Sequence, residues 1–360
     1  MIKLEHVDKY FGDLHVLKDV NLEVAEGEKL VIIGPSGSGK STTVRCMNFL
    51  EEPTSGHVYI DGQELTNKNK TRIVRDNMSM VFQQFNLVDR MSVLRNVMLG
   101  ALSRTALWRS LLGFFHEEDA RLAYKALARV GIMEKAHQRT SNLSGGQQQR
   151  CALARILASE PTAILLDEPF SALDSYLKYQ LELELAETLG GFPGTVLWVS
   201  HDRGEVFRNC RRVCVIDRGR SQPVTTLGEL FRSPGTEAAA RLSGCKNYAD
   251  ARPREDAVFL PDWGLTLSCG RPVPEGVCRI GIRAHHVQLA GPGAENAFSC
   301  TAVKVVEDVF STIVLLRPEG AAPEAPLLRM ELDKDNWQAV PDKDRLTVSV
   351  PPEAILLLES

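Results

Sequence analysis

The stretch that most constrains the fold is residues 31–42, VIIGPSGSGKST. Apolar β-branched residues lead up to Gly34 and a helical pattern follows Gly39, so the stretch predicts a buried strand, a glycine-rich turn and a helix. Gly34, Gly39, Lys40 and Ser41 fit the phosphate-loop pattern G-x-x-x-x-G-K-[ST]. Glycines let the backbone wrap an anion, the helix start presents N–H groups to it, and the lysine adds a point charge. The serine hydroxyl would then lie on Mg²⁺. A turn without a ligand is the simpler alternative, and the motifs further along the chain distinguish the two.

Composition limits the class of protein. The chain has 360 residues, of which 44% are hydrophobic and 24% are charged, as in a soluble globular protein of one large or two ordinary domains. A net charge of -4 gives no electrostatic footprint for nucleic acid, so we expect no nucleic-acid partner. No apolar run approaches the ~20 residues of a membrane helix, and the N-terminus has no apolar core of a secretion signal. We therefore expect the chain to stay in the cytoplasm and to serve a membrane only as a peripheral partner.

Two further apolar runs predict buried strands that end in polar side chains. The first, AILLDEP at residues 163–169, ends in Asp167 and Glu168, and the second, TVLWVSHD at residues 195–202, ends near His201. Open parallel sheets place their ligands at the carboxyl ends of strands. There Asp167 could hold Mg²⁺ through water, Glu168 could polarise an attacking water, and His201 could contact a terminal phosphate. Acidic pairs after strands are commonplace and a lone histidine is usually structural, so the weight of this interpretation comes from the upstream phosphate loop.

A second glycine-rich helix start lies at residues 143–147, LSGGQ. Ser144 and Gln147 have the spacing of a capping box, which would explain them locally. A cap alone does not require Gly145 and Gly146. These glycines would expose N–H groups at the positive end of the helix, where an anion could bind. The two interpretations are compatible.

The remainder of the first two thirds alternates between strands and helices. Residues 2–25 predict two antiparallel strands, near whose turn Tyr10 or Phe11 could stack on an adenine ring, although core packing is the usual role of such a residue. Residues 78–85 predict a strand that runs into Gln83. Residues 91–136 are helical in pattern and include an apolar segment, LWRSLLGFF, that is either a docking surface or a packed loop.

Past Gly219 the composition shifts. From residue 257 onward, seven short apolar runs are separated by turns rich in proline and glycine, which predicts a small β-barrel as a second domain.

Together GPSGSGKST, LSGGQ and ILLDEP, in this order and at this separation, resemble the ATP-binding cassette (ABC) family. The resemblance extends to Gln83, Asp174 and His201 and covers residues 1 to about 235. It implies an α/β fold, a P-loop NTPase cassette with a RecA-like core and a helical subdomain at about 86–160. The ATP-binding domain would span 1–240, and an accessory, OB-like β-barrel would span 246–360.

The resemblance also implies the ligands and the site. In the family, two cassettes sandwich two ATP molecules head to tail. Glu168 would be the catalytic base, His201 would sense the γ-phosphate, Gln83 would assist, and Mg²⁺ would be held by Ser41, Gln83 and Asp167. The ATP-contacting positions would be Phe11 on the adenine, the loop Gly34, Pro35, Ser36, Gly37, Ser38, Gly39, Lys40, Ser41 and Thr42, and, across the dimer, Ser144, Gly145, Gly146 and Gln147.

The resemblance to importer ATPases implies membrane permease subunits as partners, a second cassette in a homodimer, and, indirectly, an extracytoplasmic substrate-binding protein. The chain would lie at the cytoplasmic face of the cell membrane. Residues 1–66 are most similar to polar amino-acid importers, residues 71–150 to phosphonate importers, and the chain from about 152 onward to molybdate/sulfate importers. We rank molybdate or sulfate first as the cargo, with phosphonate and polar amino acids as alternatives.

Two other classes of function are alternatives to an importer ATPase. A cassette ATPase acting on nucleic acid or the ribosome usually carries two cassettes or a long heptad insertion, and neither is found in the sequence. A barrel that binds an oxyanion would use its basic residues Arg279, Arg283, His285 and His286, which form no recognisable anion motif.

Overall fold

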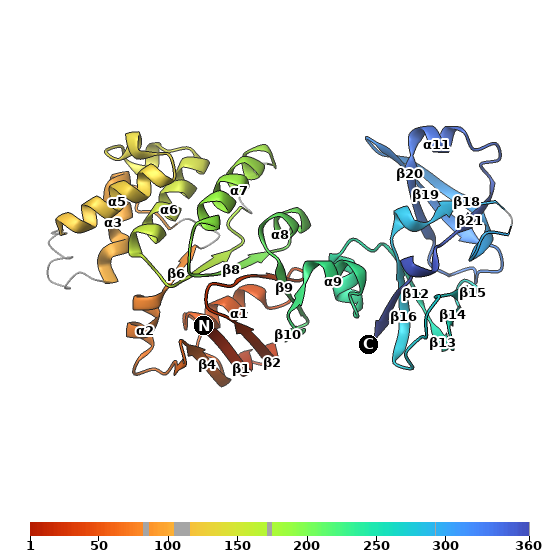
Figure 1. Ribbon diagram of the computed structural model, residues 1–360, viewed down its shortest axis with the longest axis horizontal. Coiled ribbons are helices and arrows are strands. Elements are labelled where there is room, and N and C mark those ends of the chain that lie inside the picture. Colours follow the sequence, from red (N-terminus) through yellow and green to blue (C-terminus); the bar gives the residue numbers. More distant parts are fainter. Residues whose placement is uncertain (82–85, 104–115, 171–174, 292, 360) are drawn as a thin grey trace. The chain divides into compact units, whose positions relative to one another are not determined.

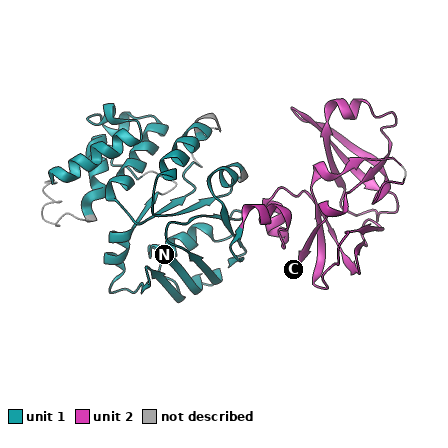
Figure 2. Ribbon diagram, in the orientation of Figure 1, with its two compact units in different colours: residues 1–225 teal, residues 226–360 magenta. Residues whose placement is uncertain are grey.

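The computed structural model describes the chain except residues 82–85, 104–115, 171–174, 292 and 360 (Figure 1). The chain divides into two compact units, Met1–Thr225 and Thr226–Ser360 (Figure 2). The helices α9 (Leu227–Arg232) and α10 (Glu237–Leu242), which we expected to close the first domain, belong to the second unit.

A four-stranded antiparallel sheet opens the first unit, in the order β2-β1-β4-β5. Its strands are β1 (Ile2–Phe11), β2 (Leu14–Val24), β4 (Ser55–Ile60) and β5 (Gln63–Glu64). The antiparallel pairing predicted for residues 2–25 is confirmed, with Ile2 opposite Val24 and Phe11 opposite Leu14.

A second, mainly parallel sheet has the order β10-β9-β3-β8-β7-β6. Its strands are β3 (Lys29–Ile33), β6 (Met78–Val81), β7 (Ala163–Asp167), β8 (Thr195–Ser200), β9 (Arg212–Asp217) and β10 (Arg220–Ser221), and β11 (Thr225–Thr226) pairs with β9 off this path. Every residue of β7 and β8 is buried, as is typical of parallel strands covered on both faces. The strand predictions at 163–169 and 195–202 are therefore confirmed.

Helices of the first unit pack on this sheet and on one another. They are α1 (Lys40–Met47), α2 (Lys70–Asn77), α3 (Val93–Met98), α5 (Glu117–Arg129), α6 (Gly145–Ser159), α7 (Ser175–Gly190) and α8 (Arg203–Asn209), with single 3₁₀ turns at Leu99–Ser103, Met133–Lys135 and Thr140–Asn142. Leu181, Leu185 and Leu189 recur every fourth residue and are buried, so one stripe of α7 faces the interior. The first unit's main core joins α1 to both sheets through Val44 and Met47.

The helical part of the first unit is built around α6, against which α3 and α5 both pack (Figure 1). This confirms the helical pattern expected after residue 91, while the segment LWRSLLGFF lies outside the described residues. Among the residues that the structure describes, no helix has the length and apolar character needed to cross a bilayer.

The second unit is made of short antiparallel strands. They are β12 (Asn247–Asp250), β13 (Arg252–Arg254), β14 (Ala257–Leu260), β15 (Leu265–Ser268), β16 (Val277–Ile282), β17 (Gln288–Leu289), β18 (Ala297–Glu307), β19 (Ser311–Pro318), β20 (Leu328–Asp333), β21 (Arg345–Ser349) and β22 (Leu356–Glu359). Besides α9 and α10, the unit contains the short helix α11 (Lys334–Gln338) and 3₁₀ turns at Ala284–His286 and Pro352–Ala354. Three sheets enclose one core around the buried Trp263, whose indole N–H donates to the Pro326 carbonyl at 2.8 Å. The predicted small β-barrel is present and nearly closed.

Candidate nucleotide-binding site

Three strand ends bring the predicted site residues to one edge of the parallel sheet. In the pairing of β3 with β8, Ile33 lies opposite Ser200, and in the pairing of β7 with β8, Asp167 lies opposite Val199. The segments that begin at Gly34, Glu168 and His201 therefore leave the sheet side by side. This edge is where open α/β sheets bind their ligands.

The glycines of the phosphate loop are required by close approach and by backbone conformation. A Cβ at position 34 would lie 2.1 Å from the Ile216 carbonyl oxygen, so no larger residue fits there. Gly39 has a φ of 105°, and a Cβ there would lie 2.8 Å from Cδ2 of Leu17. A Cβ at Gly37 would instead meet open space, and its φ of 75° lies in the left-handed region. Neighbouring atoms thus leave no room for a side chain at Gly34 and Gly39, whereas the space beside Gly37 is free.

Lys40 is the first residue of α1 and is only 5% exposed. Its Nζ donates to the carbonyl oxygens of Gly34 at 3.0 Å and Pro35 at 2.9 Å. Burial lowers the pKa of Lys40, and the nearby carboxylates of Glu168 and Asp167 partly oppose that effect. The loop therefore holds a buried ammonium group on neutral acceptors, an arrangement that favours an added negative charge.

Ser41 and Asp167 meet across the site, because the Ser41 hydroxyl donates to Oδ1 of Asp167 at 2.9 Å. Burial raises the pKa of Asp167, against the opposing effects of the Ser41 hydrogen bond and the Arg45 charge. A hydroxyl and a carboxylate are oxygen donors of the kind that Mg²⁺ prefers, so these residues fit that ion. Gln83, the third residue expected at the metal, lies outside the described residues.

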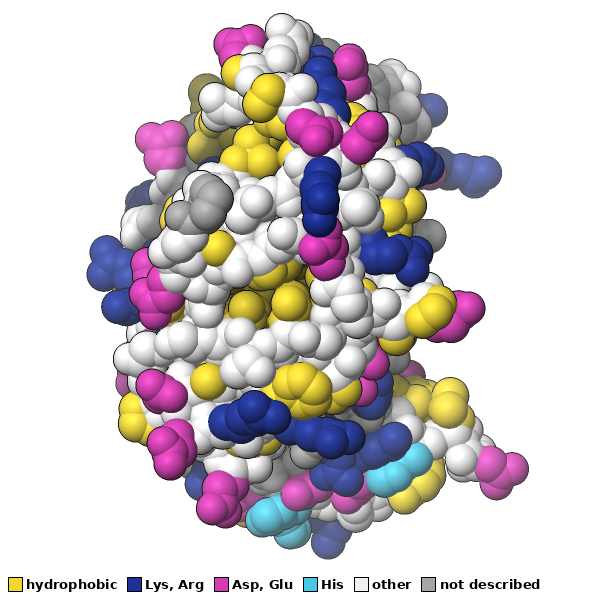
Figure 3. Space-filling view, turned by 90° about the vertical axis from the view of Figure 1, so that its right-hand side faces the viewer, with side chains coloured by type: hydrophobic (Ala, Val, Ile, Leu, Met, Phe, Trp, Pro, Cys, Tyr) yellow, Lys and Arg dark blue, Asp and Glu magenta, His cyan; other side chains and the backbone are white. Residues whose placement is uncertain are grey.

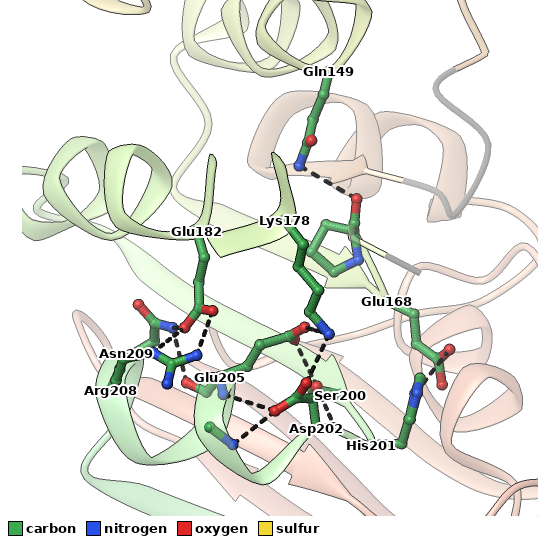
Figure 4. Close-up of polar contacts among 12 residues, drawn as sticks. Gln149, Glu168, Lys178, Glu182, Ser200, His201, Asp202, Glu205, Arg208 and Asn209 are labelled. Carbon is green, nitrogen blue, oxygen red and sulfur yellow. Dashed lines mark hydrogen bonds and ion pairs between the residues drawn. The ribbon is translucent and has the colours of Figure 1, made fainter. Parts of the chain in front are cut away.

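Glu168 and His201 face each other at the sheet edge (Figure 4). Nδ1 of His201 lies 3.3 Å from Oε2 of Glu168, and the histidine side chain is 58% exposed. Glu168 has a φ of 48°, a conformation that costs a non-glycine residue energy and is concentrated at functional sites. Its backbone N–H donates to the Val199 carbonyl oxygen at 3.1 Å. The carboxylate and the imidazole are thus held together on the exposed side of the strand ends.

The second glycine-rich helix start is a complete capping box at the beginning of α6. The Ser144 hydroxyl accepts from the Gln147 N–H at 3.4 Å, and the Gln147 side chain accepts from the Ser144 N–H at 3.1 Å. Ser144 and Gly145 are exposed, whereas Gly146 is buried. None of the hydrogen bonds described for this helix start reaches the phosphate loop of the same chain.

Phe11 ends β1 and is 45% exposed, with the Lys9 ammonium 4.8 Å from its ring centroid. The neighbouring Tyr10 stacks on His15 at a centroid distance of 3.9 Å. Of the two aromatic candidates for the adenine, Phe11 is therefore the one whose ring has no aromatic neighbour among the described contacts.

Several polar residues near the site were not singled out from the sequence. Gln149 on α6 is buried and donates to the Pro169 carbonyl oxygen at 3.3 Å, which links this helix to the segment that follows Glu168 (Figure 4). Lys178 on α7 pairs with Asp202 and Glu205, which follow His201. The spacing of Asp202 and Glu205 is a helix-start signal that would have located α8, but the partner on α7 has no local signal.

Comparison with known proteins identifies the family of the chain. The family described as ABC transporter matches residues 17–171. The glutamine transport ATP-binding protein GlnQ of Escherichia coli is 44% identical over 238 residues, which are 66% of this chain and 96% of GlnQ. The chain belongs to the family of ABC transporter ATP-binding proteins.

Other relatives match this ABC protein over different lengths. The phosphonates import ATP-binding protein PhnC of Bdellovibrio bacteriovorus is 49% identical over 178 residues, 48% of this chain and 68% of PhnC. A dimeric structure of the ATP-binding cassette MJ0796 in a post-hydrolysis state, bound to ADP and Pi, is 37% identical, with a TM-score of 0.55 over 63% of this chain and 99% of that one. The predicted P-loop NTPase cassette followed by a small β-barrel is confirmed, and this ABC protein is an ATPase that binds ATP.

Proposed function

We propose that this protein is the ATP-hydrolysing subunit of an ABC importer, in which ATP binding closes a cassette dimer and hydrolysis resets it. The observation that carries the proposal is the convergence of Lys40, Ser41, Asp167, Glu168 and His201 at one sheet edge. These groups supply a cation for phosphate, oxygen ligands for a metal, and a carboxylate beside an imidazole. Their chemistry is that of phosphoryl transfer to water.

The phosphate loop would bind the nucleotide. Backbone N–H groups of residues 37–42 would cradle the phosphates, Lys40 would shift from its loop carbonyls toward the phosphate oxygens, and Phe11 would stack on the adenine. Ser41, Asp167 and Gln83 would hold Mg²⁺, which supplies charge neutralisation at the β- and γ-phosphates.

Glu168 would act on the attacking water. Its carboxylate would accept a proton as the water oxygen bonds to the γ-phosphorus, and the β–γ bridging oxygen would leave with ADP. His201, 3.3 Å from Glu168, would contact the γ-phosphate from the neighbouring strand end.

A second copy would complete the site. Ser144, Gly145, Gly146 and Gln147 are at a helix start, two of them exposed, and would reach the γ-phosphate bound to the other copy's loop. The dimeric MJ0796 cassette supports this arrangement.

We place the dimer at the cytoplasmic face of the membrane, bound to permease subunits, with an extracytoplasmic binding protein choosing the cargo. For that cargo, glutamine transport is the stated role of a relative that matches 66% of the chain, and phosphonate import that of a relative that matches 48% of it. These relatives favour a polar amino acid, then phosphonate, over the molybdate or sulfate expected from the C-terminal half. This protein can be expressed in strains that lack an importer ATPase. Growth of these strains on glutamine, phosphonate or sulfate as the sole source of nitrogen, phosphorus or sulfur would distinguish the three cargoes.

A cassette ATPase that acts on nucleic acid is the alternative class. On the face of the molecule in Figure 3, acidic and basic side chains are interspersed, and the whole chain has a net charge of -4. Such a surface gives nucleic acid little electrostatic attraction, so transport is favoured.

The test of the proposal is the variant Glu168→Gln. Removing the general base should lower steady-state ATP turnover by at least about 10²-fold while ATP binding is retained, because the phosphate loop is unchanged. Glu134→Gln, which alters an exposed carboxylate in the same unit, serves as the control and should turn over normally. Normal hydrolysis by the Glu168→Gln protein would refute the assignment.

A further inference from the structure

Two ion pairs of opposite polarity join α7 to α8, one helical turn apart on α7 (Figure 4). Nζ of Lys178 lies 2.6 Å from Oε1 of Glu205 and 2.8 Å from Oδ2 of Asp202. Four residues along α7, Glu182 accepts from Arg208 at 2.6 Å and 2.9 Å. Glu205 is only 4% exposed, so the ion pair of Lys178 with Glu205 lies inside the interface between the two helices.

Among the described residues, the first pair is the one that the hydrogen bonds connect to the strand end carrying His201. The Ser200 hydroxyl donates to Glu205 at 2.6 Å, and the Asp202 N–H donates to the Ser200 hydroxyl at 2.9 Å. Asp202 is also the N-cap of α8, accepting from the Glu205 N–H at 3.3 Å. The residues directly before and after His201 are therefore both tied to Glu205, and Lys178 binds that glutamate and Asp202 together.

Lys178 is the counter-charge of this cluster. Burial by itself would lower the pKa of Lys178, but its hydrogen bonds to Asp202 and Glu205 outweigh burial and raise it. Burial would likewise raise the pKa of Asp202, but the hydrogen bond and charge of Lys178, together with the backbone N–H groups of Glu205 and Gly204, outweigh it and lower that pKa. Without the ammonium group, two neighbouring carboxylates would repel each other, and the turn between Ser200 and Asp202 would change its shape.

We propose that Lys178 is a positioning residue for ATP hydrolysis: through Glu205 and Asp202 it fixes the turn that aims His201 at Glu168 and at the γ-phosphate. Its place on α7 couples the orientation of the histidine to that helix. This inference rests on the proposed function, in which His201 contacts the γ-phosphate.

The test compares Lys178→Met with Arg208→Met in the full-length protein. Arg208→Met breaks the neighbouring ion pair of the same two helices but removes none of the hydrogen bonds and ion pairs that join Ser200, Asp202, Glu205 and Lys178. Lys178→Met should lower kcat by about tenfold to a hundredfold, the size of effect expected when a reacting group is misplaced, with the KM for ATP changed less than about threefold. Arg208→Met should lower the melting temperature but keep kcat within about twofold, and Lys178→Arg should recover most of the activity. Equal falls in kcat for Lys178→Met and Arg208→Met would overturn the proposal.

A double-mutant cycle separates this inference from the function on which it rests. In a His201→Ala background, Lys178→Met should cause almost no further fall in kcat, because the side chain that it positions is gone. A full additional fall would contradict the positioning role alone. Normal hydrolysis by His201→Ala itself would instead contradict the role proposed for the histidine. Should Lys178→Met fail to fold, Glu205→Gln, which keeps the shape of the side chain, tests the same contact with the same readings.

Discussion

Charged side chains at the candidate site of the cassette unit have different hydrogen-bond partners from the arginines considered as an anion site in the barrel unit. In the cassette unit, Lys40 is buried against two backbone carbonyl oxygens and Asp167 is buried against a hydroxyl. In the barrel unit, Arg279 pairs with Glu237 at 2.5 Å, and the Arg283 guanidinium donates to the Phe231 carbonyl oxygen and the Ser243 hydroxyl. At the candidate site, Lys40 and Asp167 thus hydrogen-bond to neutral groups of the cassette, whereas Arg279 and Arg283 are bound to the helices of their own unit.

This difference bears on the idea that the barrel binds an oxyanion. The arginines considered for that role, Arg279 in the barrel strand β16 and Arg283 directly after it, bind to the segment at 227–243. Burial, together with the charges of His285 and Arg283, lowers the pKa of His286, which disfavours a positive charge there near neutral pH. Arg279 and Arg283 are therefore explained by the folding of this unit.

The largest effect that separates the two units is expected for Lys40→Ala. Removing a charged hydrogen-bond donor of about 1.5–3 kcal/mol should weaken ATP binding by roughly tenfold to a hundredfold, as measured by calorimetric titration with Mg²⁺ present. Arg279→Ala is the matched removal of a positive charge from the barrel, and it should leave ATP affinity unchanged. An equal loss of affinity in both variants would break the comparison.

A smaller effect is expected for Glu237→Gln in the barrel unit. Burial would raise the pKa of Glu237, but hydrogen bonds from Arg241 and Arg279 outweigh it and lower that pKa. The carboxylate therefore stabilises the unit above its unfolded pKa of about 4.3, and this contribution is lost as the pH falls through the lower folded value.

Because these side chains are partly exposed, the contribution at pH 7 should be about 1 kcal/mol or less. Denaturant titrations of the wild type and Glu237→Gln should differ at pH 7 and converge in acid below the folded pKa. A difference in unfolding free energy that stays constant with pH would show that the pair is irrelevant to the barrel's stability.

How much of this could be predicted from the sequence depends on whether a feature is local. The strand, turn and helix at residues 31–42 and the strands ending at Asp167 and His201 were predictable, because glycine positions and unbroken apolar runs specify them within a few residues. The capping box of Ser144 and Gln147 was predictable for the same reason.

Features that depend on contacts distant in sequence were not predictable. Lys178 and Glu205 join the helix that precedes β8 in the chain to the helix that follows it. The sequence around neither residue indicates the other as its partner. Residues 227–242 are helical, like the cassette, and nothing in their sequence indicates that Glu237 among them binds Arg279 of the second unit. The shortest barrel strands, such as β13 and β17, contain too few apolar residues to show alternation.

Enclosure of ATP between two copies of this chain is the central proposal. The most direct measurement is a crystal structure of the full-length protein with Mg²⁺ and a slowly hydrolysed ATP analogue. We predict a dimer in which the triphosphate lies between the Lys40 loop of one copy and the Ser144 helix start of the other. A triphosphate bound elsewhere, or a Ser144 helix start buried within its own copy, would contradict the account.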